Sequence, residues 1–201
     1  MSTSTQPTAA MDVPPEHEEW ILPSKGKVGM ACLILTESTF FAIFVVAHLF
    51  YLGKSLTGPF ADVLNTPIIA SICLLSSSLT VVMATRALAR GKLIPFELWM
   101  LATIALGGVF LGATGIEWWG LIYHEGLTIY SNLLGTTFYS LVGFHALHVT
   151  IGLSMLAFVL ILCLLGHVRE EHAERVEILS WYWHFVDAVW IVVFTVVYVI
   201  R

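Results

Sequence analysis

The sequence predicts an all-α integral membrane protein, a bundle of five transmembrane helices. Of its 201 residues, 58% are hydrophobic and only 11% are charged, whereas about 25% of residues are charged in soluble domains. The mean hydropathy is +0.86. A membrane-spanning helix needs roughly 20 apolar residues. The chain therefore has room for several such helices and short loops, but not for a separate soluble domain.

Five apolar stretches are long enough to cross the hydrocarbon core, and we expect each to be a helix. A polar tail over residues 1–27 precedes them. The stretches cover residues 28–52, 66–88, 96–122, 133–165 and 179–200. The fourth would be about 50 Å long at 1.5 Å per residue, against a hydrocarbon core of about 30 Å, so it must tilt or project into water.

Turn-forming residues separate the early stretches, as expected for loops between helices. Gly58-Pro59 lies before the second stretch and Asn65-Thr66-Pro67 at its start, and Gly91 and Pro95 precede the third. Within the third stretch, the glycines form a small-residue face that lets a neighbouring helix approach closely. These glycines are Gly107, Gly108, Gly112 and Gly115.

Basic residues indicate the orientation of the bundle. Most of them fall in the tail, the second loop and the fourth loop, namely Lys25, Lys27, Arg86, Arg90, Lys92, Arg169 and Arg175. The opposite side holds only Lys54 and Arg201. The positive-inside rule therefore predicts a cytoplasmic N-terminus and a C-terminus outside the cell. The net charge of −5 comes from acids in the tail and fourth loop, so it does not indicate a nucleic-acid partner.

Ionisable side chains inside the apolar stretches are the candidate functional residues, because burying them in lipid is costly. The set is Glu37, Glu117, His145, His148, His184 and Asp187. Glu37 must be protonated, hydrogen-bonded or both, and either a packing role or a proton-linked role fits it. His145 and His148 share one helix face. They can fasten helices, relay protons or ligate a metal or haem.

Three blocks of sequence resemble subunit III of the haem-copper oxidases. Residues 181–190 read Trp-Tyr-Trp-His-Phe-Val-Asp-Ala-Val-Trp, like the closing helix of that family. Residues 143–149 read Gly-Phe-His-Ala-Leu-His-Val, with Ala146 where the family usually has glycine. Glu37 with Phe40-Phe41 is similar to a Ser-Glu-x-x-Phe-Phe helix, with Thr36 in place of serine. The likeness runs from about Gly29 to Arg201.

The resemblance implies a non-catalytic subunit III of an aa3-type cytochrome c oxidase in a bacterial plasma membrane. Such a subunit contacts and stabilises the oxygen-reducing subunit I, lies in a complex with subunit II, and supports proton uptake in aerobic respiration. By the same likeness, Glu37 is the family's buried carboxylate, His145 and His148 belong to the same polar cluster, and His184 and Asp187 anchor the last helix. With Glu117, these residues make up the expected buried polar network. Many members have seven helices, and this chain resembles the five-helix form. In the seven-helix members, the first two helices form one arm of a cleft that holds lipids. Bound phospholipids are therefore expected here only to the extent that this cleft is present.

The residues themselves predict no catalytic, cofactor or metal site in this chain. Oxygen chemistry at a haem-copper centre needs many histidine ligands on several helices, and a dinuclear copper site needs paired cysteines with a nearby histidine. The cysteines Cys32, Cys73 and Cys163 are isolated in apolar runs. Haem and copper are therefore expected in the partner subunits, and whether this chain counts as part of an enzyme depends on them.

Three other functions stay open on the sequence alone. One is subunit III of a bo3-type quinol oxidase. Another is a membrane dihaem cytochrome, using His48, His124, His145, His148 or His184 as haem ligands. The third is a small-solute transporter, which would be expected to show an inverted repeat and broken helices. The polar tail can also make a docking contact in a larger respiratory supercomplex.

Overall fold

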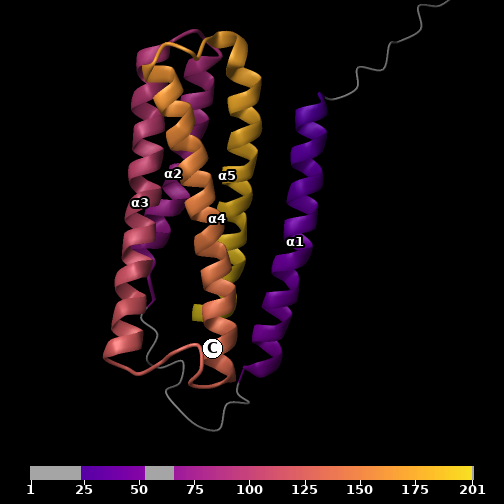
Figure 1. Ribbon diagram of the computed structural model, residues 1–201, viewed down its shortest axis with the longest axis vertical. Coiled ribbons are helices and arrows are strands. Elements are labelled where there is room, and N and C mark those ends of the chain that lie inside the picture. Colours follow the sequence, from indigo (N-terminus) through magenta and orange to yellow (C-terminus); the bar gives the residue numbers. More distant parts are fainter. Residues whose placement is uncertain (1–23, 53–65, 201) are drawn as a thin grey trace, which may run out of the picture.

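The structure, a computed structural model, describes residues 24–52 and 66–200. Within these ranges all regular structure is helical, and five helices are long and apolar enough to cross a membrane. They are α1 (Lys25–Tyr51), α2 (Ile68–Leu88), α3 (Leu93–Tyr123), α4 (Leu133–Leu164) and α5 (Ala173–Phe194), as Figure 1 shows. The predicted all-α bundle of five transmembrane helices is confirmed. Residues 1–23 of the expected tail and the Gly58-Pro59 break lie outside the described ranges.

Three helices begin earlier than the apolar pattern suggests, α1 and α3 by three residues and α5 by six. Pro95 was expected in the loop, but it lies in the first turn of α3, where its missing N–H breaks no helical hydrogen bond. The fifth helix begins at Ala173, after a short 3-10 turn over Glu170–His172. Its first turns carry charged residues. Hydropathy detects only the apolar part of a helix, so it misses the polar turns at its end.

Several helix ends are defined by local chemistry. The side chain of Ser24 accepts a hydrogen bond from the main-chain nitrogen of Lys27 at 3.5 Å, and that of Asn132 accepts from Gly135 at 2.6 Å. These side chains satisfy main-chain donors that have no partner within their helix. Gly91, between α2 and α3, has a φ of 66°, a conformation that glycine adopts without strain. The chain can therefore reverse there in a short turn.

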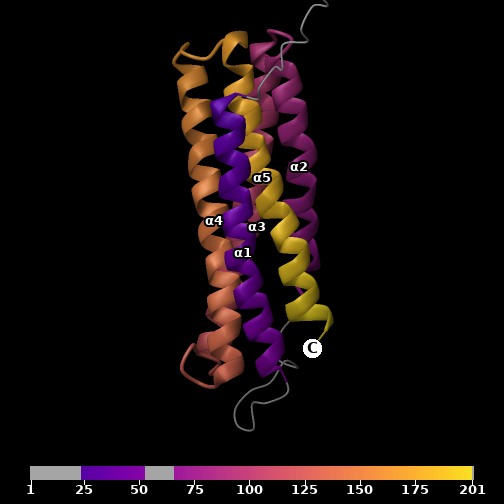
Figure 2. The ribbon, with the colours of Figure 1, turned by 90° about the vertical axis from the view of Figure 1, so that its right-hand side faces the viewer.

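The five helices do not contribute equally to the core. In α5, 56% of the most apolar window is buried, against 6% in α1. Figures 1 and 2 show α1 along one side of the bundle, next to α4 and α5, with α2 and α3 on the far side. The C-terminal end of α5 continues as a π-helical segment, η3 (Thr195–Val199). Since α1 buries so little, its position depends on a few contacts with α4 and α5.

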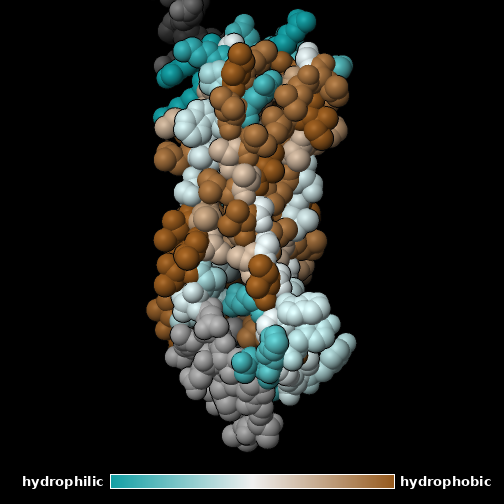
Figure 3. Space-filling view, turned by 90° about the vertical axis from the view of Figure 1, so that its left-hand side faces the viewer, coloured by the Kyte–Doolittle hydropathy of each residue, from teal (hydrophilic) through white to brown (hydrophobic). Residues whose placement is uncertain are grey.

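The outer surface is largely apolar through its middle. Figure 3 shows the side of the bundle on which α3 lies, with hydrophobic residues over the central part and hydrophilic residues towards both ends. Side chains such as Leu98, Ile116 and Trp119 are more than 60% exposed. In water such a surface would be costly, but it suits contact with lipid chains or with other membrane helices.

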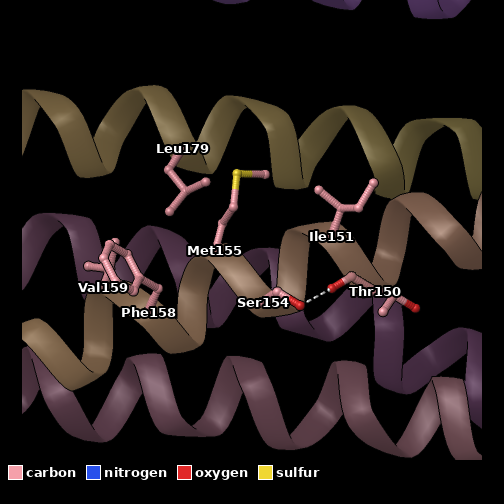
Figure 4. A pocket seen from close by; sticks show the side chains of 7 residues that line it. All are labelled: Thr150, Ile151, Ser154, Met155, Phe158, Val159 and Leu179. Atoms are coloured by element: carbon pink, nitrogen blue, oxygen red, sulfur yellow. Dashed lines mark hydrogen bonds between the residues drawn. The ribbon is translucent and has the colours of Figure 1, made fainter.

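A hollow of about 500 Å³ lies between α4 and α5, lined by Leu179 from α5 and by six residues of α4 (Figure 4). Its two hydroxyl groups already have partners in their own helix. Thr150 Oγ1 donates to the main-chain oxygen of Ala146, and Ser154 Oγ donates to that of Thr150, each at 2.8 Å. The hollow therefore offers mainly hydrocarbon contacts and no group suited to catalysis.

Candidate functional site

The first polar contact between helices joins α1 to α4. Glu37 Oε2 lies 3.2 Å from His148 Nε2, and the His148 side chain is only 9% exposed. His148 Nδ1 lies 2.8 Å from the main-chain oxygen of Phe144. A carbonyl oxygen can only accept, so Nδ1 carries a proton. The contact with Glu37 then needs one further proton, held either by the carboxyl group or by the imidazole.

Aromatic rings surround this pair. The imidazole of His148 lies 5.0 Å from the ring centroids of both Phe41 and Phe144, and 6.5 Å from that of Tyr182. Tyr182 also donates a hydrogen bond to the main-chain oxygen of His148 at 3.3 Å. Low-polarity surroundings strengthen the hydrogen bond between the carboxyl group and the imidazole. The pair therefore acts as one of the polar attachment points of α1.

His145 lies one turn away from His148 but faces a different part of the bundle. It is fully buried, its ring stacks on Trp190 at 5.0 Å, and Phe110 contacts it edge-on at 5.8 Å. Neither ring nitrogen has a hydrogen-bond partner among the described residues. Three helical residues rotate by about 300°, and the remaining 60° is enough to direct the two rings to different neighbours. The two histidines were expected to share one helix face, but their rings lie in two different environments.

A second contact joins α2 to α5. Ser78 Oγ donates a short hydrogen bond to Asp187 Oδ2 and lies 2.9 Å from His184 Nδ1. Because the hydroxyl has a single proton, which goes to the carboxylate, it accepts from His184. His184 and Asp187 therefore share one face of α5, as their spacing predicts, and both bind the same serine.

Further polar contacts lie near the end of the bundle where α1 and α3 terminate. Tyr198 Oη, in η3, donates to Glu117 Oε1 of α3 at 3.1 Å. His48 Nδ1 of α1 lies 3.0 Å from Thr137 Oγ1 of α4. The six predicted residues are therefore distributed over separate places. Glu37 meets His148, His184 meets Asp187 through Ser78, Glu117 meets Tyr198, and His145 makes only ring contacts.

The geometry includes no cluster of metal-binding side chains in residues 24–52 and 66–200, where no three His, Cys, Asp or Glu residues converge. The polar groups instead join helices in pairs. This arrangement can hold a bundle together and can hold a proton at Glu37 and His148.

Comparison with known proteins identifies the family of this chain. A family model for cytochrome c oxidase subunit III matches residues 17–200. The chain belongs to the cytochrome c oxidase subunit III family. The resemblance of the three sequence blocks is confirmed. As a subunit III, the chain is part of a haem-copper oxidase complex and a multi-pass membrane protein.

Curated relatives from bacteria match nearly the whole chain. Cytochrome c oxidase subunit 3 of Corynebacterium diphtheriae is 34% identical over 187 residues, which cover 89% of this chain and 90% of the relative. The protein of the same name from Alkalihalophilus pseudofirmus is 33% identical over 190 residues, with 92% of each chain covered. That from Glycine max is 40% identical over 135 residues, which cover 67% of this chain and 48% of the relative.

Sequence reasoning missed the serines of α2 that hold the closing helix of this subunit III. Ser77 Oγ accepts from Trp183 Nε1 at 2.9 Å, and Ser71 Oγ accepts from Trp190 Nε1 at 3.0 Å. Ser78 binds the carboxylate of Asp187. The run Ser76-Ser77-Ser78 in an apolar helix was an available signal, because buried hydroxyl and indole groups need partners.

The glycine face of α3 also differs from the expectation. Within residues 24–52 and 66–200, a Cβ atom at Gly108, Gly112 or Gly115 would meet no atom within 4 Å, so no described helix packs on them. The close approach occurs instead at Gly107, where a Cβ atom would lie 2.8 Å from Leu153 and 3.0 Å from Trp183. The spacing of the glycines in the sequence predicts a face of small residues. Which of these glycines a neighbouring helix contacts depends on how the helices pack.

We expect Ser78→Ala to destabilise this subunit III by about 0.5–2 kcal/mol, the range found for polar contacts between membrane helices. The change leaves Asp187 without its donor. Ser76→Ala is the matched control, since Ser76 Oγ bonds only the main-chain oxygen of Cys73 in its own helix. Thermal unfolding in detergent measures the difference. Equal effects of the two substitutions would contradict a stabilising role for the contact with Asp187.

Proposed function

We propose that this chain is the non-catalytic subunit III of an aa3-type cytochrome c oxidase in a bacterial plasma membrane. In that complex it contacts subunit I, stabilises it during turnover and supports proton uptake from the cytoplasmic side. The match of the family model over residues 17–200 carries this proposal. The names of the bacterial relatives, which specify cytochrome c oxidase, support the choice of cytochrome c over quinol as electron donor.

The interhelical contacts support a stabilising role. Glu37 and His148 join α1 to α4, and Ser78 with His184 and Asp187 joins α2 to α5. The ionisable groups of these contacts bind other helices of the same chain. Haem and copper belong, in this proposal, to subunits I and II, and the positive-inside rule gives the chain a cytoplasmic N-terminus.

Gentle co-purification tests the assignment. A tagged chain is solubilised from its own membranes, and the proteins that accompany it are identified by mass spectrometry. The proposal expects oxidase subunits I and II, with a copper-binding motif in subunit II and the visible spectrum of haem a. A subunit II without copper ligands would instead indicate the bo3-type quinol oxidase. Other respiratory complexes in the same fraction would indicate a supercomplex, and recovery of the chain without any oxidase subunit would contradict the proposal.

Substitution of Glu37 tests the stabilising role in the intact oxidase. Glu37→Ala removes the polar contact of α1 with His148, so we expect several-fold less subunit III to remain after detergent washing. Initial oxygen consumption should stay within about twofold of the unsubstituted enzyme. Glu125→Ala, at an exposed position after α3, is the control. Full retention of the subunit together with abolished turnover would contradict this role and favour a direct part in proton transfer.

Glu37→Gln separates the two proton arrangements of the pair. The glutamine amide can donate a hydrogen bond to the unprotonated Nε2 of His148, so it replaces a protonated carboxyl group. With a cationic imidazole, the amide oxygen can still accept a hydrogen bond, but the negative charge of the carboxylate is lost. Retention close to that of the unsubstituted enzyme indicates a neutral pair, whereas a clear loss, up to that of Glu37→Ala, indicates an ion pair. Quantitative immunoblotting of subunit III against subunit I measures both.

A further inference from the structure

The three side chains that join α2 to α5 lie near the middle of the membrane-spanning part of the chain. Ser78 is the middle residue of α2, and His184 and Asp187 lie near the middle of the apolar segment Glu170–Val199. Figure 2 shows α2 beside α5. We call Ser78, His184 and Asp187 the serine bridge. At this depth a charge has to be balanced by neighbouring protein groups, because water is distant.

Asp187 is the most deeply buried member of the serine bridge, with 4% of its surface exposed. Its Oδ2 accepts the short hydrogen bond from Ser78, but its Oδ1 has no hydrogen-bond partner among the described residues. A buried carboxylate with a single donor is costly, because burial removes the water that would otherwise stabilise its charge. The site therefore favours a proton that cancels this charge.

The nearest group that can carry a balancing positive charge is His184. No ion pair of the described residues includes Asp187, and the one charged residue of α2, Arg86, lies about 12 Å from Ser78 along the helix axis. The ionisable groups of the neighbouring helices have contacts of their own. Lys27 pairs with Glu177, Glu37 pairs with His148, Glu117 binds Tyr198, and His145 stacks on Trp190.

Ser78 can pass a proton between the two ionisable groups. Next to a carboxylate, Nδ1 of His184 donates to Ser78 Oγ at 2.9 Å, and Ser78 donates to Asp187 Oδ2. When Oδ2 carries a proton, it donates to Ser78, and Ser78 donates to an unprotonated Nδ1. One proton moves from Nδ1 to Oγ while the hydroxyl proton moves to Oδ2. Imidazolium and carboxylate thereby become imidazole and carboxylic acid, and the heavy atoms keep their positions.

The serine bridge reaches the surface of the bundle at His184. This side chain is half-buried, and its Nε2 makes no hydrogen bond within residues 24–52 and 66–200. Nε2 is also absent from the fully enclosed unpaired polar atoms, which include Oδ1 of Asp187. A proton can therefore enter or leave at Nε2 while the carboxyl group stays enclosed.

We propose that Ser78, His184 and Asp187 together bind one proton, which Ser78 passes between the imidazole and the carboxyl group. Without this proton, the serine bridge carries one negative charge near the middle of the membrane. With it, the net charge is zero, and the cost of burying a charge at this depth favours the neutral form. The site is separate from the Glu37 and His148 pair on α1 and α4. It does not depend on the electron donor of the oxidase.

Selective isotope labelling tests the proposal in the full chain, reconstituted in lipid bilayer discs at neutral pH. The sequence has three aspartates, Asp12, Asp62 and Asp187, and only Asp187 lies in an apolar stretch. Aspartates in water are carboxylates at this pH. Infrared spectroscopy of labelled aspartate measures the protonated share of Asp187, and NMR spectroscopy of labelled histidine measures the doubly protonated share of His184. We expect the two shares to add up to one proton per chain.

Three substitutions distinguish a shared proton from one that belongs to a single residue. In His184→Gln, the amide can still bond to Ser78 but takes up no proton, so Asp187 should hold the whole proton. In Asp187→Asn, His184 should be singly protonated. Ser78→Thr keeps the hydroxyl group and should give the signals of the unsubstituted chain. His172→Gln, in the 3-10 turn before α5, is the control and should change neither signal.

Three results would each overturn the proposal. The first is a carboxylate at Asp187 together with a singly protonated His184 in the unsubstituted chain. The second is a doubly protonated His184 in Asp187→Asn, because that proton would not depend on the carboxyl group. The third is a carboxylate at Asp187 in His184→Gln, because the site would then tolerate the charge. If a variant does not fold, the unsubstituted chain still decides, since Asp187 is the only aspartate among the described residues.

Discussion

Replacing Trp183 by alanine is expected to lower the free energy of unfolding of this subunit by about 3–5 kcal/mol, the range for loss of a large buried aromatic side chain. Trp183 is fully buried. It projects from α5 onto Gly107 of α3 and Gly152 of α4, and its indole donates to Ser77 of α2. One side chain thus touches three neighbouring helices. Its removal leaves a cavity at their meeting point and a serine without its donor.

Thermal unfolding in detergent micelles measures this loss. Trp119→Ala is the control, because Trp119 is 61% exposed and its ring lies beside that of Tyr123 in its own helix, at 4.2 Å between ring centroids. Trp183→Phe refills much of the volume but not the hydrogen bond to Ser77. Its cost should therefore be smaller than that of alanine. Equal stability of Trp183→Ala and Trp119→Ala would contradict the central position of Trp183.

A leucine in place of Gly152 is expected to destabilise the bundle by about 2 kcal/mol or more, since overpacking a well-packed core costs 1–3 kcal/mol and sometimes more. Even the first added carbon would lie 2.9 Å from the ring of Trp183 and 3.3 Å from that of Tyr182. The ring of Trp183 is buried and held by Ser77, so it cannot move aside easily. Helix α4 would have to move away from α5.

Gly112→Leu provides the comparison, because a side chain at Gly112 would meet no other atom of the described chain within 4 Å. Both substitutions replace glycine by leucine in the middle of a helix, so their intrinsic helix propensities match. We expect Gly112→Leu to leave the unfolding temperature of the isolated subunit unchanged or slightly raised. A loss of stability as large as that at Gly152 would show that helix packing is not the cause.

Composition and hydropathy were sufficient to predict the membrane helices. An apolar stretch long enough to cross the hydrocarbon core can satisfy its main-chain groups only as a helix or in a closed barrel, and the stretches here have helical lengths. The motif around His184 and Asp187 was also readable, because its residue types and spacing are specific to the subunit III family. Both predictions concern properties that lie within a single segment of chain.

The partners of the polar residues were not readable in the same way. In a helix whose faces are all apolar, hydropathy marks the span but does not show which face meets a neighbour. Ser78 and Asp187 are more than a hundred positions apart in sequence, and no local pattern pairs them. The same applies to Glu117 and Tyr198, which meet only because the end of the chain packs beside α3.

The sequence by itself determined that this protein is a five-helix membrane subunit of the haem-copper oxidase family and which ionisable residues enter the membrane. Only the tertiary structure decided that Glu37 joins His148 and not His145, that serines of α2 hold tryptophans of α5, and that Trp183 packs against Gly107 and Gly152. The physical reason is that span length and burial cost follow from each segment alone. Pairing depends on how the helices rotate about their axes when they pack.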